Sequence, residues 1–159
     1  MALTQFHICN YQQLVDWIDS PELNYLWGGP KFTFPLDRSQ IDAHVSLPQC
    51  QAFFYLHHGE RAGYVELFEV DEHIARICRV FVHPDFRGHG IAKQMLVELI
   101  EVARQQHYAK LNLCVFSQNI AAIRCYESLG FIETKREQGT RVFNGQSWEL
   151  IYMDLKLDE

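Results

Sequence analysis

The sequence has no long apolar run. No stretch reaches the roughly 20 consecutive apolar residues that a membrane-spanning helix needs. The start of the chain, MALTQFHICN, lacks the basic and apolar regions of an export signal. We therefore expect a cytoplasmic protein that has no membrane partner.

Cysteines are few and show no pairing pattern. There are five, an odd number, and none are spaced as Cys-x-x-Cys. This indicates neither a disulfide framework nor a zinc knuckle, and it fits a reducing compartment. His57 and His58 are adjacent, so on a strand they would point to opposite faces and make a poor metal pair. We expect no bound metal.

Basic residues are also scarce. Lys and Arg number 14 against 20 Asp and Glu, which gives a formal net charge of −6. No basic run of the kind that follows the phosphates of a duplex occurs, so we expect no nucleic-acid partner. A cationic amine would instead be attracted to a chain of this net charge.

What the chain has in quantity is apolar side chains. Of its 159 residues, 48% are hydrophobic and 13% aromatic, which is enough for one buried core. No repeat or Pro/Ser-rich linker divides the sequence, so we predict a single domain over residues 1–159. A homodimer is a possible assembly.

The N-terminal third is predicted to hold short helices around an aromatic loop. We expect a strand near residues 6–8, a helix that opens at Asn10 with Gln13 as its capping-box partner, and a second helix near residues 38–45. Four aromatic side chains of the loop and of a distant strand have two alternative roles. They line an acceptor site, because aromatic faces bind cations, or they form a packed cluster that holds the helices in place. These side chains are Trp27, Phe32, Phe34 and Trp148.

The rest of the chain alternates strands and helices. Three β-rich runs between residues 52 and 82 are joined by turns so short that the runs must be antiparallel neighbours. Residues 91–103 place apolar side chains on one helical face. A strand over residues 111–116 and a helix that ends before Gly130 follow. Residues 131–134 and 147–155 are predicted to form a closing hairpin around Asn144-Gly145. The order predicts an α/β fold, with a mixed sheet flanked by helices.

A glycine loop precedes the longest predicted helix. The first turn of a helix has four unpaired N–H groups, which Ser, Thr, Asp or Asn normally cap, but Arg87-Gly88-His89-Gly90 offers none of these residues. The glycines allow close approach, and the helix dipole, Arg87 and Lys93 add positive charge, so an anion suits the site. A tight turn capped by water is the alternative. A dinucleotide-binding fingerprint would need a third glycine or alanine at the position of Lys93, and a Walker A loop would need the pattern Gly-Lys-Ser/Thr, which is absent. Both kinds of nucleotide-binding loop are therefore disfavoured.

Two segments resemble one known family. Arg87-Gly88-His89-Gly90-Ile91-Ala92 is similar to the acyl-CoA signature of the GNAT superfamily of N-acetyltransferases, Arg/Gln-x-x-Gly-x-Gly/Ala. Asn119 to Phe131 resembles the second conserved segment of that superfamily, at the expected distance downstream. Within the superfamily, the second segment is similar to that of ribosomal-protein alanine acetyltransferases. Two linked motifs are more specific than one.

The resemblance implies a fold and a cosubstrate. The sheet should be mixed and mostly antiparallel, with about seven strands and a V-shaped split between the fourth and fifth. Acetyl-CoA should lie in this split, with its pantetheine arm against Val80, Phe81 and Val82 and its pyrophosphate at the glycine loop. The cofactor-binding residues implied by motif position are Val80, Phe81, Val82, Arg87, Gly88, His89, Gly90, Ile91, Ala92, Lys93 and Asn119. Asn119 would bind the cofactor arm, cap a helix, or do both.

The chemistry needs an acid and a base. Tyr126 matches the usual acid of the superfamily, the alternative being a core aromatic. A glutamate of the ribosomal-protein enzymes is replaced here by Cys114, which is either a small core residue or a nucleophile. Glu66, in the middle of an apolar strand, is the first candidate base, or else a solvent-facing residue. His83 is a second candidate, or else an ordinary loop residue.

Three functions remain open at this point. The first is an enzyme that transfers acetyl from acetyl-CoA to a primary amine, on a small molecule or a protein, by direct transfer in a ternary complex. The second is a non-catalytic module that binds or senses acyl-CoA, a reading that Cys114 supports and Tyr126 opposes. The third is a nucleotide-dependent enzyme that uses the same glycine loop.

Overall fold

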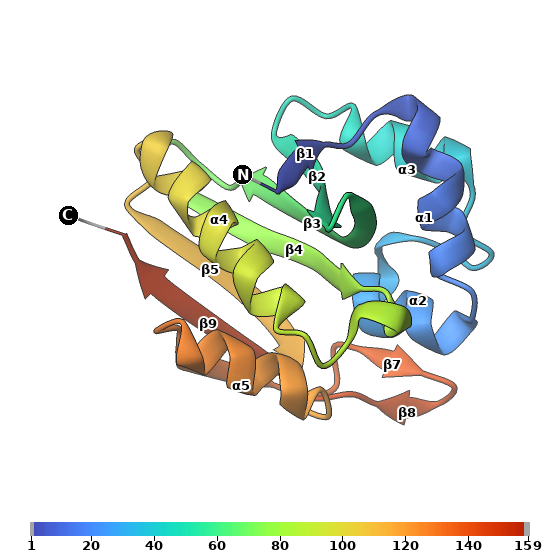
Figure 1. Ribbon diagram of the computed structural model, residues 1–159. Coiled ribbons are helices and arrows are strands. Elements are labelled where there is room, and N and C mark those ends of the chain that lie inside the picture. Colours follow the sequence, from blue (N-terminus) through green and yellow to red (C-terminus); the bar gives the residue numbers. More distant parts are fainter. Residues whose placement is uncertain (1, 158–159) are drawn as a thin grey trace.

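The computed structural model describes residues 2–157, and a seven-stranded sheet forms its centre (Figure 1). The order across the sheet is β1-β2-β3-β4-β5-β9-β6. Its strands are β1 (Leu3–Gln5), β2 (Cys50–His57), β3 (Glu60–Glu69), β4 (Ile74–Val82), β5 (Lys110–Phe116), β6 (Ile132–Glu137) and β9 (Leu150–Lys156). A separate hairpin joins β7 (Val142–Phe143) to β8 (Gln146–Ser147).

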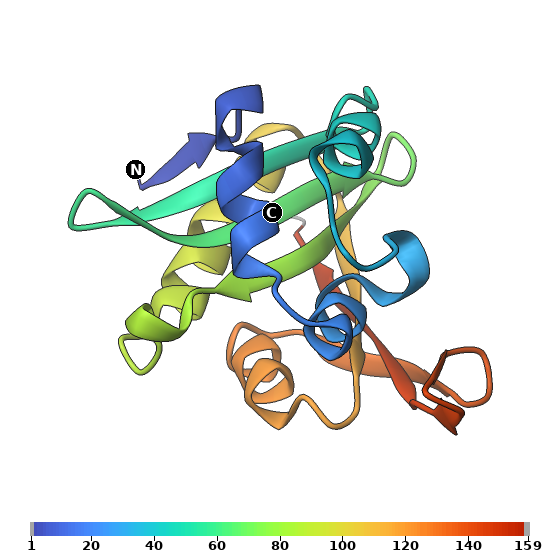
Figure 2. The same ribbon diagram turned by 90° about the vertical axis from the view of Figure 1, so that its right-hand side faces the viewer.

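Helices cover both faces of the sheet (Figures 1 and 2). One face carries α4 (Ile91–Gln105) and α5 (Ile120–Ser128), and the other carries α1 (Tyr11–Trp17), α2 (Pro21–Gly28) and α3 (Arg38–Val45). Short 3-10 turns are η1 (Ile8–Asn10), η2 (Gly29–Lys31) and η3 (Pro84–Phe86). Among residues 2–157, no helix is long and apolar enough to cross a bilayer.

The sheet splits between β4 and β5. All other neighbouring strands are antiparallel, whereas β4 and β5 are parallel and pair only over Ile74–Arg76 and Lys110–Asn112. Beyond these residues the two strands diverge, so each has an unpaired inner edge. The predicted fold class, a mostly antiparallel mixed sheet with a split between the fourth and fifth strands, is confirmed.

Two cores hold the helices against the sheet. On one face, α4 buries Met95, Leu96, Leu99 and Ala103 completely, which confirms the apolar face predicted from the sequence. On the other face, Phe6, Leu14, Ile41 and further apolar residues pack against the aromatic rings of β2 and β3. The split therefore opens between two well-packed layers.

The N-terminal third departs most from the prediction. The strand predicted at residues 6–8 lies at Leu3–Gln5, and the capping box of Asn10 and Gln13 is wrong, because the Asn10 side chain accepts a bond from the His7 amide instead. The helix α2 was not predicted, although it has ordinary start signals: the Ser20 side chain accepts from the Leu23 amide, and proline occupies the first turn. The predicted second helix matches α3.

The later elements follow the prediction closely. The three strands between residues 50 and 82, the strand after α4 and the helix before Gly130 are all present. Gly130 has a φ of +102°, as expected for the residue that ends a helix. Asn144 and Gly145 both have positive φ at the tip of the β7–β8 hairpin, which confirms the predicted turn.

Candidate active site in the split of the sheet

A cavity of about 750 Å³ occupies the split. Its walls include the end of β4, the end of β5, the start of α5 and the C-terminal part of α2. On the face covered by α4, the cavity is lined by Val80, Val82 and Tyr126, which are in contact with the core of that face. The cavity is also lined by Arg76 and Cys114. Their neighbours along β4 and β5 belong to the α4 core, so these two side chains point to the opposite face of the sheet. The cavity therefore runs through the sheet from one face to the other.

Several of the predicted cofactor-binding residues line this cavity. Val80, Phe81, Val82, Arg87 and Asn119 all contribute to its wall. In β4, the residues from Val80 onward lie beyond the segment that pairs with β5, so this inner edge has backbone groups without a strand partner. An extended ligand arm fits an edge of this kind.

The glycine loop leads from the cavity into α4. Gly90 is the N-cap residue of α4 with a φ of +71°, and no side chain caps the first turn. Gly88 has a φ of +82°, and a Cβ placed there would meet nothing within 4 Å. The first N–H groups of α4 therefore have no capping side chain within the described residues. His89, Ile91, Ala92 and Lys93 belong to this loop and first turn but do not line the cavity.

Asn119 occupies the N-cap position of α5. Its φ and ψ of −85° and 69° are those of a residue outside the helix, yet its side chain makes no capping hydrogen bond. The side chain lies in the cavity wall instead. The sequence-based alternative of a capping side chain is thus not observed, and the amide is free to bond to a ligand.

Tyr126 lies in the cavity wall opposite β4. Its side chain is buried, at 7% exposure, and its ring packs edge to face on Phe131. Among residues 2–157, no side chain or backbone group forms a hydrogen bond with its hydroxyl. Burial, followed by the nearby cysteines, raises the pKa of Tyr126 well above its usual value, so the hydroxyl keeps its proton at neutral pH.

A bulge interrupts β4 beside the cavity. Tyr64 pairs with Phe81 and Glu66 pairs with Cys78, so β4 has one more residue than β3 over this segment. Arg79 lies in the bulge with a φ of +53°. Its carbonyl accepts a hydrogen bond from the Trp27 indole at 2.9 Å. The bulge takes the backbone around Val80 out of the β3 ladder at the point where the cavity begins.

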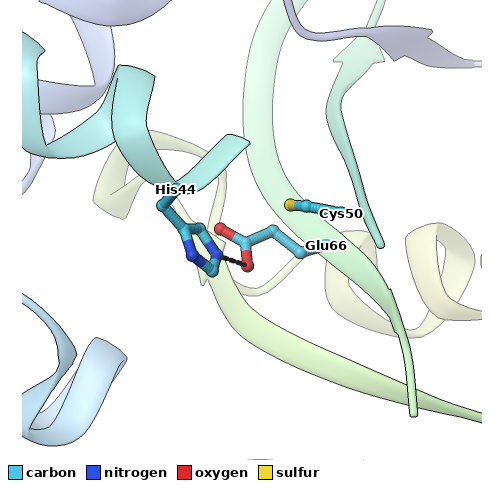
Figure 3. Close-up of side chains that lie close together, drawn as sticks. All are labelled: His44, Cys50 and Glu66. Carbon is cyan, nitrogen blue, oxygen red and sulfur yellow. Dashed lines mark hydrogen bonds and ion pairs between the residues drawn. The ribbon is translucent and has the colours of Figure 1, made fainter. Parts of the chain in front are cut away.

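Glu66, on β3 next to this bulge, is fully buried, and its carboxylate faces the His44 ring (Figure 3). Its Oε1 lies 2.8 Å from both His44 Nε2 and Arg79 Nε, and the Tyr64 hydroxyl donates to its Oε2 at 2.5 Å. Burial alone would raise the pKa of Glu66, but the Arg79 charge and the His44 hydrogen bond overcome this and hold the pKa below its usual value. The alternative of a solvent-facing Glu66 is wrong, and the carboxylate does not line the cavity.

His44 and Arg79 connect this buried carboxylate to the cavity. Both line it, and His44 Nδ1 is buried without a hydrogen-bond partner among residues 2–157. Neither residue was predicted from the sequence. Arg79 could have been found in the same way as Glu66, because each is a charged residue in an apolar strand. His44 lies on a short polar helix, where a histidine is not unusual, so nothing in the sequence marked it.

His44, Cys50 and Glu66 also form the one group of possible metal ligands found among residues 2–157 (Figure 3). Their ligand atoms lie within 4.8 Å of one another. However, Arg79 Nε already bonds to Glu66 Oε1, and Arg79 Nη2 lies 3.0 Å from His44 Nε2. A guanidinium therefore occupies the place where a cation would bind, and the group is best described as an ion-pair network.

The other candidate side chains have different places. His83 lines a separate hollow of about 540 Å³, and its Nδ1 accepts a bond from the Asp85 amide. Cys114 is exposed in the cavity wall, and desolvation outweighs three nearby arginines to raise its pKa, so it is a thiol. A thiol is a poor nucleophile. The alternative of Cys114 as a small core residue is wrong, because its side chain is exposed.

The four predicted aromatic side chains have different places. Trp27, Phe32 and Trp148 are buried in packed clusters, and of these three only Trp27 also lines the cavity. Phe34 is 39% exposed. The wall that was predicted for an acceptor site is therefore limited to Trp27, and the alternative of a packed cluster holds for Phe32 and Trp148.

Comparison with known proteins gives consistent results. The chain is 38% identical over 80 residues to the L-methionine sulfoximine/L-methionine sulfone acetyltransferase of Salmonella typhimurium, a match that covers 50% of this chain and 47% of that protein. The chain thus spans about half the length of this relative. The S. typhimurium protein yncA, solved with acetyl-CoA, superimposes with a TM-score of 0.80 at 23% identity, covering 100% of this chain and 96% of the other.

A similar likeness extends to the ribosomal-protein alanine N-acetyltransferase of Brucella melitensis. Its TM-score is 0.80 at 20% identity, with 99% of this chain and 100% of the other covered. At this identity the likeness shows the fold. The family model for acetyltransferase (GNAT) proteins matches residues 12–131, which include the glycine loop, the split and Tyr126. The chain therefore belongs to the GNAT acetyltransferase family.

Proposed function

We propose that this protein is an N-acetyltransferase that transfers acetyl from acetyl-CoA to a primary amine by direct transfer, as one domain in the cytoplasm. The observation that carries the proposal is the cavity through the split sheet. It has an uncapped helix start at one mouth and an unpartnered tyrosine hydroxyl in its wall. The family and the acetyltransferase relatives support the same reaction.

In the proposed complex, acetyl-CoA enters from the face covered by α4. The free N–H groups from Gly88 to Lys93 and the Arg87 side chain bind the pyrophosphate, because a helix start with no cap favours an anion. Asn119 and the inner edge of β4 bind the pantetheine arm. The backbone N–H groups near Val80 then lie where they can donate to the thioester carbonyl.

The transfer itself breaks one bond and forms another. The neutral amine nitrogen attacks the thioester carbonyl carbon, and the carbon–sulfur bond breaks as the amide forms. The leaving thiolate takes a proton from the Tyr126 hydroxyl, which burial keeps protonated. The nitrogen gives up a proton to water, because Glu66 is enclosed by three partners and does not line the cavity. A proton from this water then restores the Tyr126 hydroxyl, so that the protein returns to its starting state. Glu66 acts indirectly, by holding Arg79 and His44.

A panel of amines distinguishes the enzyme from a sensing module. We expect release of free CoA with some of the small amines, and we expect Tyr126→Phe to lower kcat by about 100-fold while acetyl-CoA binding stays the same. The measurement is thiol release in steady state, together with calorimetry for binding.

Phe131 offers the matched control for this variant. It contacts Tyr126 within the same core, so Phe131→Leu disturbs the packing without removing a hydroxyl. Acetyl-CoA binding without turnover of any amine would show a sensing module instead. Stabilisation by ATP or NAD but not by CoA would indicate the nucleotide-dependent alternative.

A further inference from the structure

Positive charge gathers in the half of the cavity that faces α2. Lys31, Arg76, Arg79 and Arg141 line this half, and with Arg87 they make up five of the chain's 14 Lys and Arg residues. Within residues 2–157, no Asp or Glu lines the cavity. The local charge of the cavity is therefore positive, although the net charge of the chain is −6. The net charge led us to expect attraction of a cationic amine, but the residues that line the cavity would repel one.

Three of these basic side chains have no ion-pair partner within residues 2–157. Arg76 Nε donates to the amide oxygen of Asn112 at 2.9 Å, and Arg141 has only a contact of 3.4 Å with the neighbouring Thr140 carbonyl. Lys31 has no side-chain hydrogen bond within the same range. Outside the cavity, Arg104 and Arg136 form ion pairs, whereas Arg38, Arg61 and Arg124 have none within the same range. Positive charges left free in a concave site are the arrangement that an anionic ligand completes.

Arg76, Arg79 and Arg141 line the same cavity as Cys114. Desolvation raises the pKa of this thiol, and the charges of Arg76, Arg141 and Arg79 act in the opposite direction. These three arginines come from β4 and from the loop before β7, on opposite sides of the split. Glu137 also acts on Cys114, but Tyr152 and Thr140 hold its Oε1. Two guanidinium groups from different elements can thus meet one ligand.

Building on the proposed function, we infer that the acceptor is a small amine that carries a carboxylate, and that Arg76 and Arg141 bind this carboxylate. The planar guanidinium forms two parallel hydrogen bonds with a carboxylate, which fixes the orientation as well as the position. Arg79 lines the same half of the cavity, with its charge balanced by Glu66 and its position fixed by its bonds to Glu66 and His44. With its carboxylate held on the α2 face, the substrate directs its nitrogen toward the bulge in β4.

The same charges favour the reactive form of the nitrogen. An ammonium group beside several cations has a lower pKa than in water, because like charges disfavour the charged form. The neutral amine is the nucleophile, so the basic cavity favours deprotonation of the substrate ammonium group. This matters because position 114 is a cysteine and offers no carboxylate that could accept the proton. A polyamine, in contrast, would bring further positive charge into this half of the cavity and be repelled.

Matched sets of amines test this inference. Leucine, serine and phenylalanine are each supplied as the free acid, as the amide and as the decarboxylated amine, next to spermidine, and kcat/KM is measured with saturating acetyl-CoA. We expect at least one acid to exceed its own amide and amine by about tenfold or more. Equal or better use of the amides, the simple amines or spermidine would overturn the inference while leaving the acetyltransferase proposal intact.

Charge-removing variants locate the site. We expect the double variant Arg76→Gln/Arg141→Gln to raise KM for the preferred acid about tenfold or more and to change KM for acetyl-CoA less than twofold. Arg104→Gln, which removes an exposed arginine from α4, serves as the control and leaves both values unchanged. An unchanged KM for the acid in the double variant would contradict the assignment of these arginines.

A binding measurement separates this inference from the proposed reaction. The thermal midpoint of the CoA-bound protein is measured with the N-acetyl derivatives of the three acids and with their amides. We expect one of the acids to raise the midpoint by about 3 °C and the amides to have little effect. A shift with the acids but no acetylation of any amine would refute the reaction and keep the anion site. No shift with any acid would refute the anion site.

Discussion

Arg79 combines a strained backbone with a buried ion pair. Its φ of +53° is unfavourable for a residue with a side chain, at a cost on the order of 1 kcal/mol. The Trp27 indole holds its carbonyl, and Glu66 and His44 hold its guanidinium. At the scale of single residues, therefore, the bulge in β4 depends on contacts made at both ends of one arginine.

Replacing the buried carboxylate tests this dependence. Glu66→Gln removes the charge and keeps the shape, so Arg79 is left 12% exposed and without its counter-ion. We expect a loss of about 3 kcal/mol in the free energy of unfolding at pH 7, measured by urea denaturation. Glu133→Gln removes an exposed carboxylate from an ion pair with Arg136 and should leave stability close to that of the unchanged protein.

The pH dependence of this difference has a definite sign. The folded protein holds the pKa of Glu66 below its ordinary value of 4.5, so the stabilisation is complete above that pH and declines as the pH falls through the folded value. The gap in stability between the unchanged protein and Glu66→Gln should therefore narrow below about pH 4.5. A gap that stays constant with pH would contradict the ion pair.

Individual residues could be predicted from the sequence only in part. Glu66 was selected because a charge in an apolar strand is unusual, and the structure shows that it is buried rather than solvent-facing. Its partner His44 lies 22 positions away on a short helix, and such a contact has no local signal. Lys31, Arg76 and Arg141 come from separate elements and gather only when the sheet splits.

At the scale of elements, the start of α4 is the part that the sequence predicted best. The uncapped first turn could be inferred from residue types alone, because a missing cap is a local property. Strands β2 to β4 and the late hairpin were predicted for the same reason, by alternation and short turns. The N-terminal helices were predicted less well, since they are short and their packing on β2 and β3 decides their limits.

A bulky residue at the start of α4 should prevent cofactor binding. Gly90→Val places a branched side chain at a φ of +71°, beside N–H groups that we expect to bind the pyrophosphate. We expect CoA affinity to fall by about tenfold or more, measured by calorimetry.

Gly145→Val is the matched control. Gly145 has a similar φ of +76° at the tip of the β7–β8 hairpin, and a Cβ there meets nothing within 4 Å. The control carries the same backbone strain without touching α4, so CoA binding should persist. Equal affinity in Gly90→Val and Gly145→Val would show that the glycine loop does not bind the pyrophosphate.

At the scale of the whole molecule, the sheet separates two layers that have different composition. One layer contains α4, α5 and the glycine loop, and the other contains α1 to α3 (Figure 2). Most of the basic residues of the cavity line its half on the side of α1 to α3. The sequence could predict both layers and the split, because family motifs mark β4, α4 and α5. It could not predict the charge of the far side.

A passage that is open on both faces has a kinetic consequence. If acetyl-CoA enters from the α4 face and the amine from the α2 face, as we propose, neither substrate blocks the other, and we expect that either can bind first. We expect intersecting rather than parallel lines when initial rates are plotted for both substrates, and competition of CoA with acetyl-CoA but not with the amine. The two products can then depart on opposite sides of the sheet, without passing one another.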